Sequence, residues 1–348
     1  MKPLLPPLPS VEPEVVERCV RAMDDVAAAL SAADEPARAL FTAVQHRHVV
    51  EALTTVIPVA STTAAPVITP RRRFLSGALS ARTAAVRNAL RHLDTRVAMV
   101  GLGSLDHVVA RETPYVLNAL VEGQSPGGHE TNAGSIRVTS SSFKDADNDY
   151  TPPEAARCGE LLDAAVEVAT TVPAPPVVAA GWLTLSMFAV HPFVDGNGRT
   201  ARLLFHGIHS SAAGNGIDWG TIETWGLERH AYLSAIHRSV RPAGDGRVEL
   251  VDPLPFIGFV TASVVAGAER VTRRLAALNE QLDRSQRTLG NSDEALVHAF
   301  VWSERNVRHA DLVELALPDD RARAACNRLV AGGHLTWSER HGLNLRRA

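Results

Sequence analysis

Apolar residues along this chain recur mostly three and four positions apart, the spacing that places side chains on one face of an α-helix. Val16, Val20 and Met23 show this period in the first such segment. Ser10 is expected to cap this helix and Asp34 the next, because their side-chain oxygens can accept free backbone N–H groups. The pattern predicts helices at about residues 10–30, 35–53, 80–93, 104–121, 154–170, 177–190, 200–211, 222–238 and 255–282.

One apolar segment, residues 171–194, has no formal charge and approaches the length of a membrane span. Prolines interrupt its start, and His191 and Pro192 interrupt its end. The helix that remains, about 177–190, is shorter than a spanning helix. We therefore expect a buried central helix of a bundle and no membrane partner.

Two regions depart from the helical period. Residues 134–153 contain two stretches of strand composition around the acidic turn 145–149, which predicts a β-hairpin, with a disordered acidic loop as the alternative. Residues 291–348 predict helices near 292–302, 310–315 and 319–331, followed by strands around a polar turn. That order resembles a winged helix-turn-helix domain.

Composition places the chain among soluble globular proteins, with 45% hydrophobic and 21% charged residues. We expect an N-terminal helical region at 1–79, a central core at 80–285 and a separate unit at 291–348. The net charge of -3 predicts no general attraction to nucleic acid. The three cysteines lack zinc-site spacing and are widely separated, and residues 1–10 show no signal-peptide pattern, so a reducing cytoplasm is expected.

The densest group of reactive residue types is 191–202, which reads HPFVDGNGRTAR. Pro192 disfavours helical backbone at the residue before it, so His191 is predicted at a helix end that faces a loop. Its imidazole titrates near neutrality and could take a proton from an attacking hydroxyl. Asp195 offers hard carboxylate oxygens of the kind that Mg²⁺ prefers.

The following residues suit phosphate binding. Gly196, Asn197 and Gly198 can turn successive backbone N–H groups inward, as an anion nest at a helix N-terminus. Arg199 and Arg202 are three apart, so they share a helix face from which guanidinium groups can grip phosphate oxygens. A plain turn between helices would explain each residue alone, but the whole set supplies what phosphoryl or nucleotidyl transfer needs.

Residues 191–202 resemble the Fic-family motif H-P-F-x-[DE]-G-N-G-R-x-x-R and match it at every specified position. Residues 134–153, with Arg137, resemble the family's flap hairpin, and the helices from about 80 to 274 follow the order of its helical core. The resemblance implies a mainly α fold. The expected architecture is a Fic-type helical bundle with a β-hairpin flap, to which a C-terminal winged-helix domain is added.

The resemblance also implies an activity, the transfer of AMP from ATP to a protein hydroxyl. ATP and Mg²⁺ are then the expected cofactors, and a protein target would align on the flap at 134–153 by β-strand addition. Gly198 favours AMP transfer, since Doc-type kinases carry lysine at that position. The implied roles are general base for His191, Mg²⁺ ligand for Asp195, phosphate nest for Gly196, Asn197 and Gly198, and outer phosphate contacts for Arg199 and Arg202.

Many family members carry an inhibitory helix with the pattern [ST]-x-x-x-E-[GN], which has no clean copy in this chain. Glu51 has the glutamate without the flanking residue types. Glu122, in the stretch NALVEG, is closer in letters but precedes the flap. We interpret both as ordinary helix glutamates, and the hypothesis is weak inhibition or restraint by another element.

The C-terminal unit gives a second hypothesis. Residues 321–348 hold six arginines and one acidic residue, Glu339, which suits contact with DNA phosphates. The alternative is a protein contact, including a homodimer. A DNA-binding regulator with a nucleotide-sensing Fic core is therefore the rival function, and the intact His191 favours the enzyme.

Overall fold

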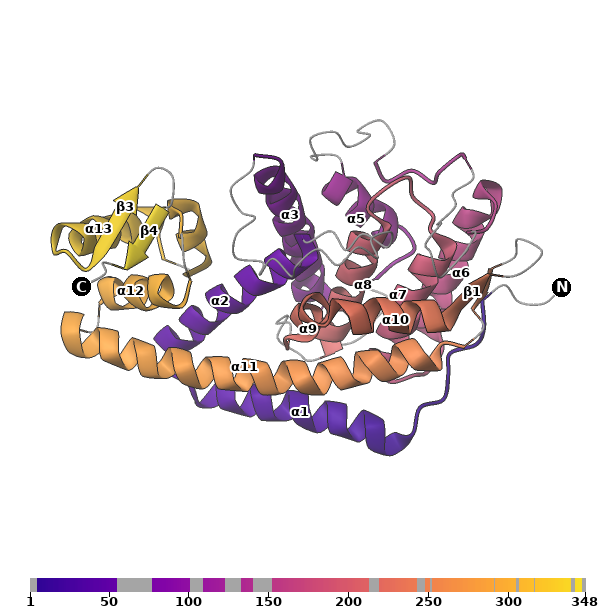
Figure 1. Cartoon of the computed structure of the whole chain (residues 1–348), viewed down its shortest axis with the longest axis horizontal. Helices are drawn as coiled ribbons and strands as arrows, with labels where there is room; N and C mark the ends of the chain where they lie inside the picture. The colour runs from indigo at the N-terminus through magenta and orange to yellow at the C-terminus, as the bar shows by residue number, and fades with distance from the viewer. Residues whose placement is uncertain are drawn as a thin grey trace.

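The computed structural model of the protein describes residues 5–54, 77–100, 109–122, 133–139, 152–212, 219–242, 248–250, 252–290, 292–304, 307–315, 317–338 and 342–345. Helices form most of this part of the chain (Figure 1). The helices are α1 (Pro13–Ala32), α2 (Glu35–Thr54), α3 (Gly77–Val100), α5 (Thr113–Glu122), α6 (Ala155–Thr171), α7 (Pro176–Val190), α8 (Asn197–Ala212), α9 (Thr221–Leu227), α10 (Arg229–Ser239), α11 (Leu254–Leu289), α12 (Asp293–Ser303), the 3₁₀ helix η3 (His309–Leu315) and α13 (Asp319–Ala331).

The mainly helical fold predicted from the sequence is confirmed, and so is one of the two predicted caps. Asp34 Oδ1 accepts a hydrogen bond from the backbone N–H of Ala37 at 2.8 Å, so this carboxylate caps α2. The Ser10 cap is wrong. Helix α1 begins only at Pro13 and has no side-chain cap, because a proline in the first turn lacks one of the N–H groups that a cap would satisfy.

Four predicted helices differ from the structure by a break or by more than three residues at one end. Those expected at 80–93 and 255–282 are longer, as α3 and α11. The helix expected at 104–121 starts at Thr113, because Thr113 Oγ1 accepts the Ala110 N–H and closes a turn there; residues 104–108 lie outside the described chain. The helix expected at 222–238 is interrupted at Glu228, whose φ of -100° and ψ of 42° separate α9 from α10. On either side of this break the rings of Trp225 and Tyr232 stack at 5.3 Å.

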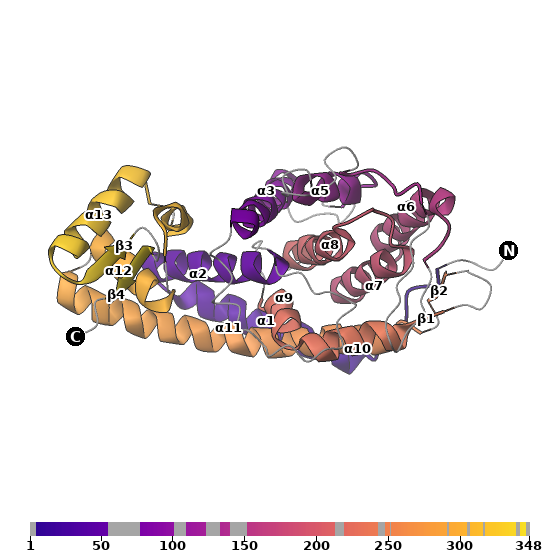
Figure 2. The same cartoon turned by 45° about the horizontal axis from the view of Figure 1, so that its top comes forward.

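Helix α7 lies at the centre of the bundle, as its apolar sequence predicts. It has 15 residues, nearly all of them buried, and packs against α6, α8 and α11. Helix α11 is the one described helix that is long and apolar enough to cross a membrane by length and composition. Half of its most apolar window is buried in the protein, and α1 runs alongside it (Figures 1 and 2).

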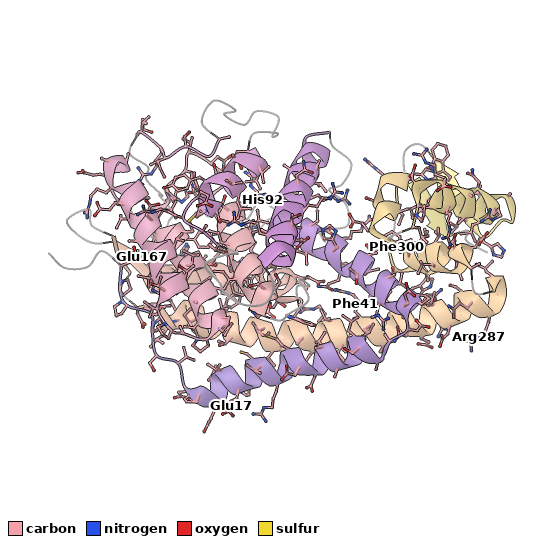
Figure 3. All side chains as sticks on the ribbon, turned by 180° about the vertical axis from the view of Figure 1, so that it is seen from behind. Glu17, Phe41, His92, Glu167, Arg287 and Phe300 are labelled. Carbon is pink, nitrogen blue, oxygen red and sulfur yellow. The ribbon has the colours of Figure 1, made fainter. Side chains whose placement is uncertain are left out.

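Two apolar clusters meet along α2. Its C-terminal residues Val49, Val50 and Leu53 belong to the cluster around α7 and α8. Its N-terminal half, with Leu40 and Phe41, belongs to the cluster that includes α12 and α13. Figure 3 labels Phe41 of α2 and Phe300 of α12, which are both members of this second cluster. Helix α2 therefore connects the central bundle to the C-terminal unit.

The C-terminal unit has the order of elements that the sequence predicts. After α12, η3 and α13 come the antiparallel strands β3 (Leu335–Ser338) and β4 (Gly342–Leu345), and Val307 pairs with Leu343 on the other side of β4. A winged-helix identity for this unit stays a prediction. The small antiparallel pair β1 (Val240–Pro242) and β2 (Val248–Leu250) was not expected from the sequence.

The predicted flap hairpin is described only in part. Ile136 forms an isolated antiparallel bridge with Phe193, so the first predicted strand lies against residues 191–196, the motif loop between α7 and α8. The turn at 145–149 and the returning strand at 150–151 lie outside the described residues. No disulfide joins the cysteines, since all three are described and are buried free thiols.

Candidate active site

His191 ends α7, as Pro192 predicted, and it has an unusual backbone. Its φ of 46° and ψ of 58° are left-handed, and it is the one non-glycine residue with positive φ among those described. Arg137 holds this conformation from two sides. Its Nε donates to the His191 carbonyl at 2.9 Å, and its backbone N–H donates to the Pro192 carbonyl at 2.9 Å. A conformation of this kind persists only where neighbours fix it, which is common at functional sites.

The electrostatic surroundings keep the His191 ring neutral. Burial, and after it the positive charge of Arg137, together lower the pKa of His191 from 6.5 to about 3. At neutral pH the imidazole therefore has a nitrogen lone pair able to accept a proton. This is the form that a general base requires.

The motif loop is closed by Asn197. Its side-chain Oδ1 accepts the Phe193 N–H at 2.9 Å, and its Nδ2 donates to the Phe193 carbonyl at 2.8 Å. Phe193 itself is buried in the central cluster, with its ring edge against Tyr115 at a centroid distance of 5.9 Å. The side chain of Asn197 thus shapes the loop, while its backbone lies at the start of α8.

Gly196 and Gly198 leave the space that an anion nest requires. Gly196 has a φ of 79°, and a Cβ there would lie 2.5 Å from Glu122 Oε1. A Cβ on Gly198 would lie 3.4 Å from Arg202 Nη1, at the boundary between a tight and an ordinary van der Waals contact. Because α8 begins at Asn197, this small-residue turn opens onto a helix N-terminus, which suits phosphate oxygens.

The Asp195 side chain fits a divalent cation. It is 66% exposed, so a cation bridging to phosphate could reach it. Its Oδ1 also accepts the Gly196 N–H at 2.6 Å, which fixes the carboxylate beside the nest. Exposed carboxylate oxygens next to an anion cradle are the donor set that a magnesium nucleotide would need.

Both motif arginines are buried, and they have different partners. Arg199 Nη2 lies 2.6 Å from Glu122 Oε1 and 3.7 Å from Asp195 Oδ1. Arg202 Nη2 donates to the Leu53 carbonyl of α2 at 3.3 Å. Helix α8 thus brings both guanidinium groups to the nest, as their spacing of three predicted, but α5 holds one and α2 the other.

Two residues of α5 were missed as parts of this site. Asn118 Nδ2 donates to the Asp195 carbonyl at 2.9 Å, and its Oδ1 accepts the Gly134 N–H at 2.9 Å. Glu122, interpreted from the sequence as an ordinary helix glutamate, is the buried partner of Arg199. A signal was present, because these two polar residues lie four apart, on one face of an otherwise mostly apolar helix.

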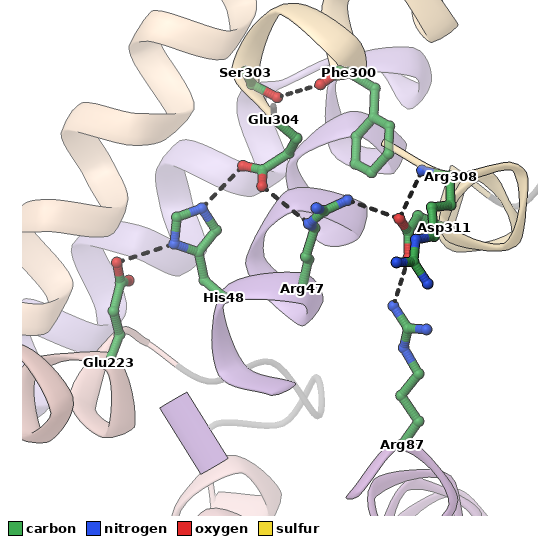
Figure 4. Close-up of polar contacts among 9 residues, drawn as sticks. All are labelled: Arg47, His48, Arg87, Glu223, Phe300, Ser303, Glu304, Arg308 and Asp311. Carbon is green, nitrogen blue, oxygen red and sulfur yellow. Dashed lines mark hydrogen bonds and ion pairs between the residues drawn. The ribbon is translucent and has the colours of Figure 1, made fainter. Parts of the chain in front are cut away.

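A polar cluster joins α2 to the C-terminal unit, and Figure 4 shows its contacts. Arg47 contacts Glu304 Oε2 at 3.2 Å and Asp311 Oδ2 at 3.1 Å. His48 lies between Glu223 and Glu304, at 3.1 Å and 3.0 Å. Burial alone would lower the pKa of His48, but hydrogen bonds to these two carboxylates outweigh it and raise the pKa to about 9. The ring is therefore charged at neutral pH.

Glu51 lies one turn after Arg47 on the same helix. It is half-buried in the last turn of α2, near the Leu53 carbonyl that contacts Arg202. The interpretation of Glu51 as an ordinary helix glutamate stays a prediction.

Comparison with known proteins agrees with this fold. Residues 117–208 match the model of the Fic/DOC family. A Fic family protein from Desulfovibrio desulfuricans G20 is similar over 96% of this chain and 94% of its own, at 13% identity and a TM-score of 0.53. A variant fragment of Fic-1 from C. elegans covers 76% of this chain and 72% of its own, at 17% identity and a TM-score of 0.51.

A Fic domain-containing signaling protein from Bacteroides thetaiotaomicron VPI-5482 is also similar. It covers 76% of this chain and 97% of its own, at 14% identity and a TM-score of 0.50. No curated protein matches the sequence significantly. Residues 117–208 are a Fic/DOC family domain, and the mainly helical fold is that of Fic proteins.

Proposed function

We propose that this protein is an AMP transferase that moves AMP from ATP to a hydroxyl side chain of another protein. The observation that carries the proposal is the neutral His191 ring, held in a left-handed backbone beside a nest that opens onto α8. Gly198 supports AMP transfer over phosphorylation, because lysine stands at that position in the Doc-type kinases. Members of the family commonly carry out AMP transfer to proteins, which agrees with this site.

The chemistry follows from the positions of these groups. His191 accepts the proton of the target hydroxyl as its oxygen bonds to the α-phosphorus, and the bond from that phosphorus to the bridging oxygen of pyrophosphate breaks. The backbone N–H groups of Asn197 and Gly198 and the two motif arginines bind the phosphate oxygens and hold them in line, while the Gly196 N–H holds the Asp195 carboxylate beside them. Mg²⁺ at Asp195 would neutralise charge that develops on the leaving group.

The target protein is proposed to bind at the flap. Val138 follows the Ile136–Phe193 bridge by two residues, and its side chain is 91% exposed. This exposed residue lies beside the proposed catalytic histidine, where a strand of the target could pair with the flap and place its hydroxyl near His191. We expect this reaction in the cytoplasm, where ATP and protein targets are present together.

DNA binding by the C-terminal unit is a separate proposal, with less support. The arginines of α13 have acidic partners within the unit: Arg321 contacts Asp293 and Arg323 contacts Asp319, at 2.7 Å and 2.8 Å, and Arg328 contacts Glu294. These exposed pairs weaken the positive field that phosphate binding needs. Protein contact or a homodimer through this unit is the alternative.

The experiment compares two positions of the label in ATP. With Mg²⁺ and a lysate of the source cells, label at the α-phosphate is expected to enter protein, whereas label at the γ-phosphate is not. His191→Ala should abolish the transfer, and His230→Ala, an exposed histidine on α10, should not. Transfer of γ-label would indicate a kinase, and no transfer to lysate or to the protein itself would favour the nucleotide sensor.

A further inference from the structure

Two carboxylates face the same nitrogen of Arg199. Nη2 is 2.6 Å from Glu122 Oε1, which is ion-pair distance, and 3.7 Å from Asp195 Oδ1, which is beyond hydrogen-bond distance. The side chains of Arg199 and Glu122 are 6% and 5% exposed, whereas that of Asp195 is 66% exposed. The guanidinium therefore makes its close ion pair with the buried carboxylate and only a longer one, without hydrogen-bond contact, with the exposed carboxylate.

The position of Glu122 is fixed by the motif loop. A Cβ added to Gly196 would lie only 2.5 Å from Glu122 Oε1, so the carboxylate packs directly against the backbone of the motif loop. Asn118, one helical turn earlier, donates to the Asp195 carbonyl. Helix α5 thus sets the distance between Asp195 and the Arg199 guanidinium, because Asn118 contacts the first residue and Glu122 contacts the second.

This arrangement matters for cation binding. A guanidinium with a buried stem needs an anionic partner, because an unpaired charge in a low-dielectric site is costly. Without Glu122, the nearest carboxylate is Asp195, whose Oδ1 at 3.7 Å is within ion-pair distance and about one ångström beyond a charged hydrogen bond. Pairing with Arg199 would neutralise Asp195 and place a positive group where a divalent cation has to bind.

We propose that Glu122 is a positioning residue that holds Arg199 away from Asp195 and so keeps the Asp195 carboxylate open to a divalent cation. The inference rests on the proposed function, in which Asp195 is the metal ligand. It differs from inhibition through Glu51 or another helix, because it predicts that removal of Glu122 weakens metal binding.

The test measures binding of Mn²⁺ by electron paramagnetic resonance in the presence of a non-hydrolysable ATP analogue, whose phosphates complete the coordination of the ion, so that it does not depend on transfer. Glu122→Gln should raise the Mn²⁺ dissociation constant about tenfold. In this variant the ion has to displace Arg199 from Asp195, which breaks one charged hydrogen bond. Asp195→Asn should remove the binding, and Glu112→Gln, an exposed carboxylate just before α5, should leave it unchanged. The concentration of Mg²⁺ for half-maximal AMP transfer should rise in parallel, with recovery at high Mg²⁺.

A double-mutant cycle with Arg199→Gln distinguishes movement of the Arg199 guanidinium from the simple loss of the Glu122 negative charge. In the Arg199→Gln background the effect of Glu122→Gln should vanish, because no guanidinium remains to approach Asp195. An effect of the same size in both backgrounds would overturn the inference, as would unchanged Mn²⁺ affinity in Glu122→Gln. If Arg199→Gln does not fold, a crystal structure of Glu122→Gln decides instead, with hydrogen-bond contact between Arg199 and Asp195 expected.

The two proposals fail in different ways. Wild-type protein that binds Mn²⁺ through Asp195 yet transfers no AMP would refute the proposed function and leave the inference standing. Glu122→Gln protein that transfers AMP faster than wild type at every Mg²⁺ concentration would mean that Glu122 restrains Arg199 from phosphate, and the inference would be wrong.

Discussion

Arg202 Nη2 donates a hydrogen bond to the backbone carbonyl of Leu53 at 3.3 Å. This contact joins the last residue of the Fic-type motif to the C-terminal end of α2, where the helix dipole is negative. The second motif arginine is thus oriented by an element that lies outside the Fic/DOC match at 117–208.

Arg202 is expected to be essential for nucleotide binding. Arg202→Lys keeps the charge but loses the fork that can contact both Leu53 and a phosphate, so kcat/KM for ATP should fall by about 10²-fold. Steady-state kinetics with labelled ATP measure this loss. Arg238→Ala removes an exposed arginine on α10 and should change nothing. A Lys variant with wild-type kinetics would show that charge alone suffices.

Gly196 should tolerate no side chain. Gly196→Ala places a Cβ 2.5 Å from Glu122 Oε1 and forces alanine into a φ of 79°, which alone costs about 1–2 kcal/mol. We expect a lower melting temperature and loss of AMP transfer. The matched control is Gly258→Ala on α11, where a Cβ meets nothing within 4 Å. Equal melting temperatures for the two variants would contradict the proposed packing of α5 under the loop.

Docking of the C-terminal unit should weaken at high pH. The pKa of His48 is raised from 6.5 to about 9, so its favourable contribution is complete below 6.5 and is lost as the pH rises through 9. Hydrogen exchange in α12 and η3 should therefore accelerate above that pH. In His48→Gln the alkaline step should disappear. An alkaline step of the same size in this variant would assign it to other groups.

Acid should destabilise the bundle through two buried histidines. Burial lowers the pKa of His206 to about 3 and that of His209 to about 4, from 6.5. Because the folded state resists protonation, stability is lost as the pH falls below 6.5 and continues to fall until these lower values are reached. Urea midpoints between about pH 7 and about pH 4 measure the loss. His206→Gln should reduce the slope, and an unchanged slope would contradict this assignment.

The sequence predicted the local part of the site and missed its long-range part. His191 at a helix end and the two arginines on one face of α8 follow from residues adjacent in the chain, so local rules suffice. The contact of Arg199 with Glu122 spans 77 positions, and the choice between Glu122 and Asp195 as partner depends on how α5 packs. Residue spacing within 191–202 carries no information on that packing.

The errors in the helices have a similar origin. The apolar period at 222–238 continues through Glu228, so only tertiary packing shows the break that separates α9 from α10. Ser10 is a good cap by type, yet Pro13 sets where α1 begins. The strands β1 and β2 have three residues each, too few for an alternating pattern to be recognised.

Helix α2 couples the unfolding of the central bundle to that of the C-terminal unit. Its two halves belong to different apolar clusters, so neither the bundle nor the C-terminal unit encloses its own interior without it. A chain cut near Gly290 would leave the surface around Leu40 and Phe41 exposed to water. The sequence predicts a boundary between two units near Gly290. We nevertheless expect both units to unfold in one cooperative transition.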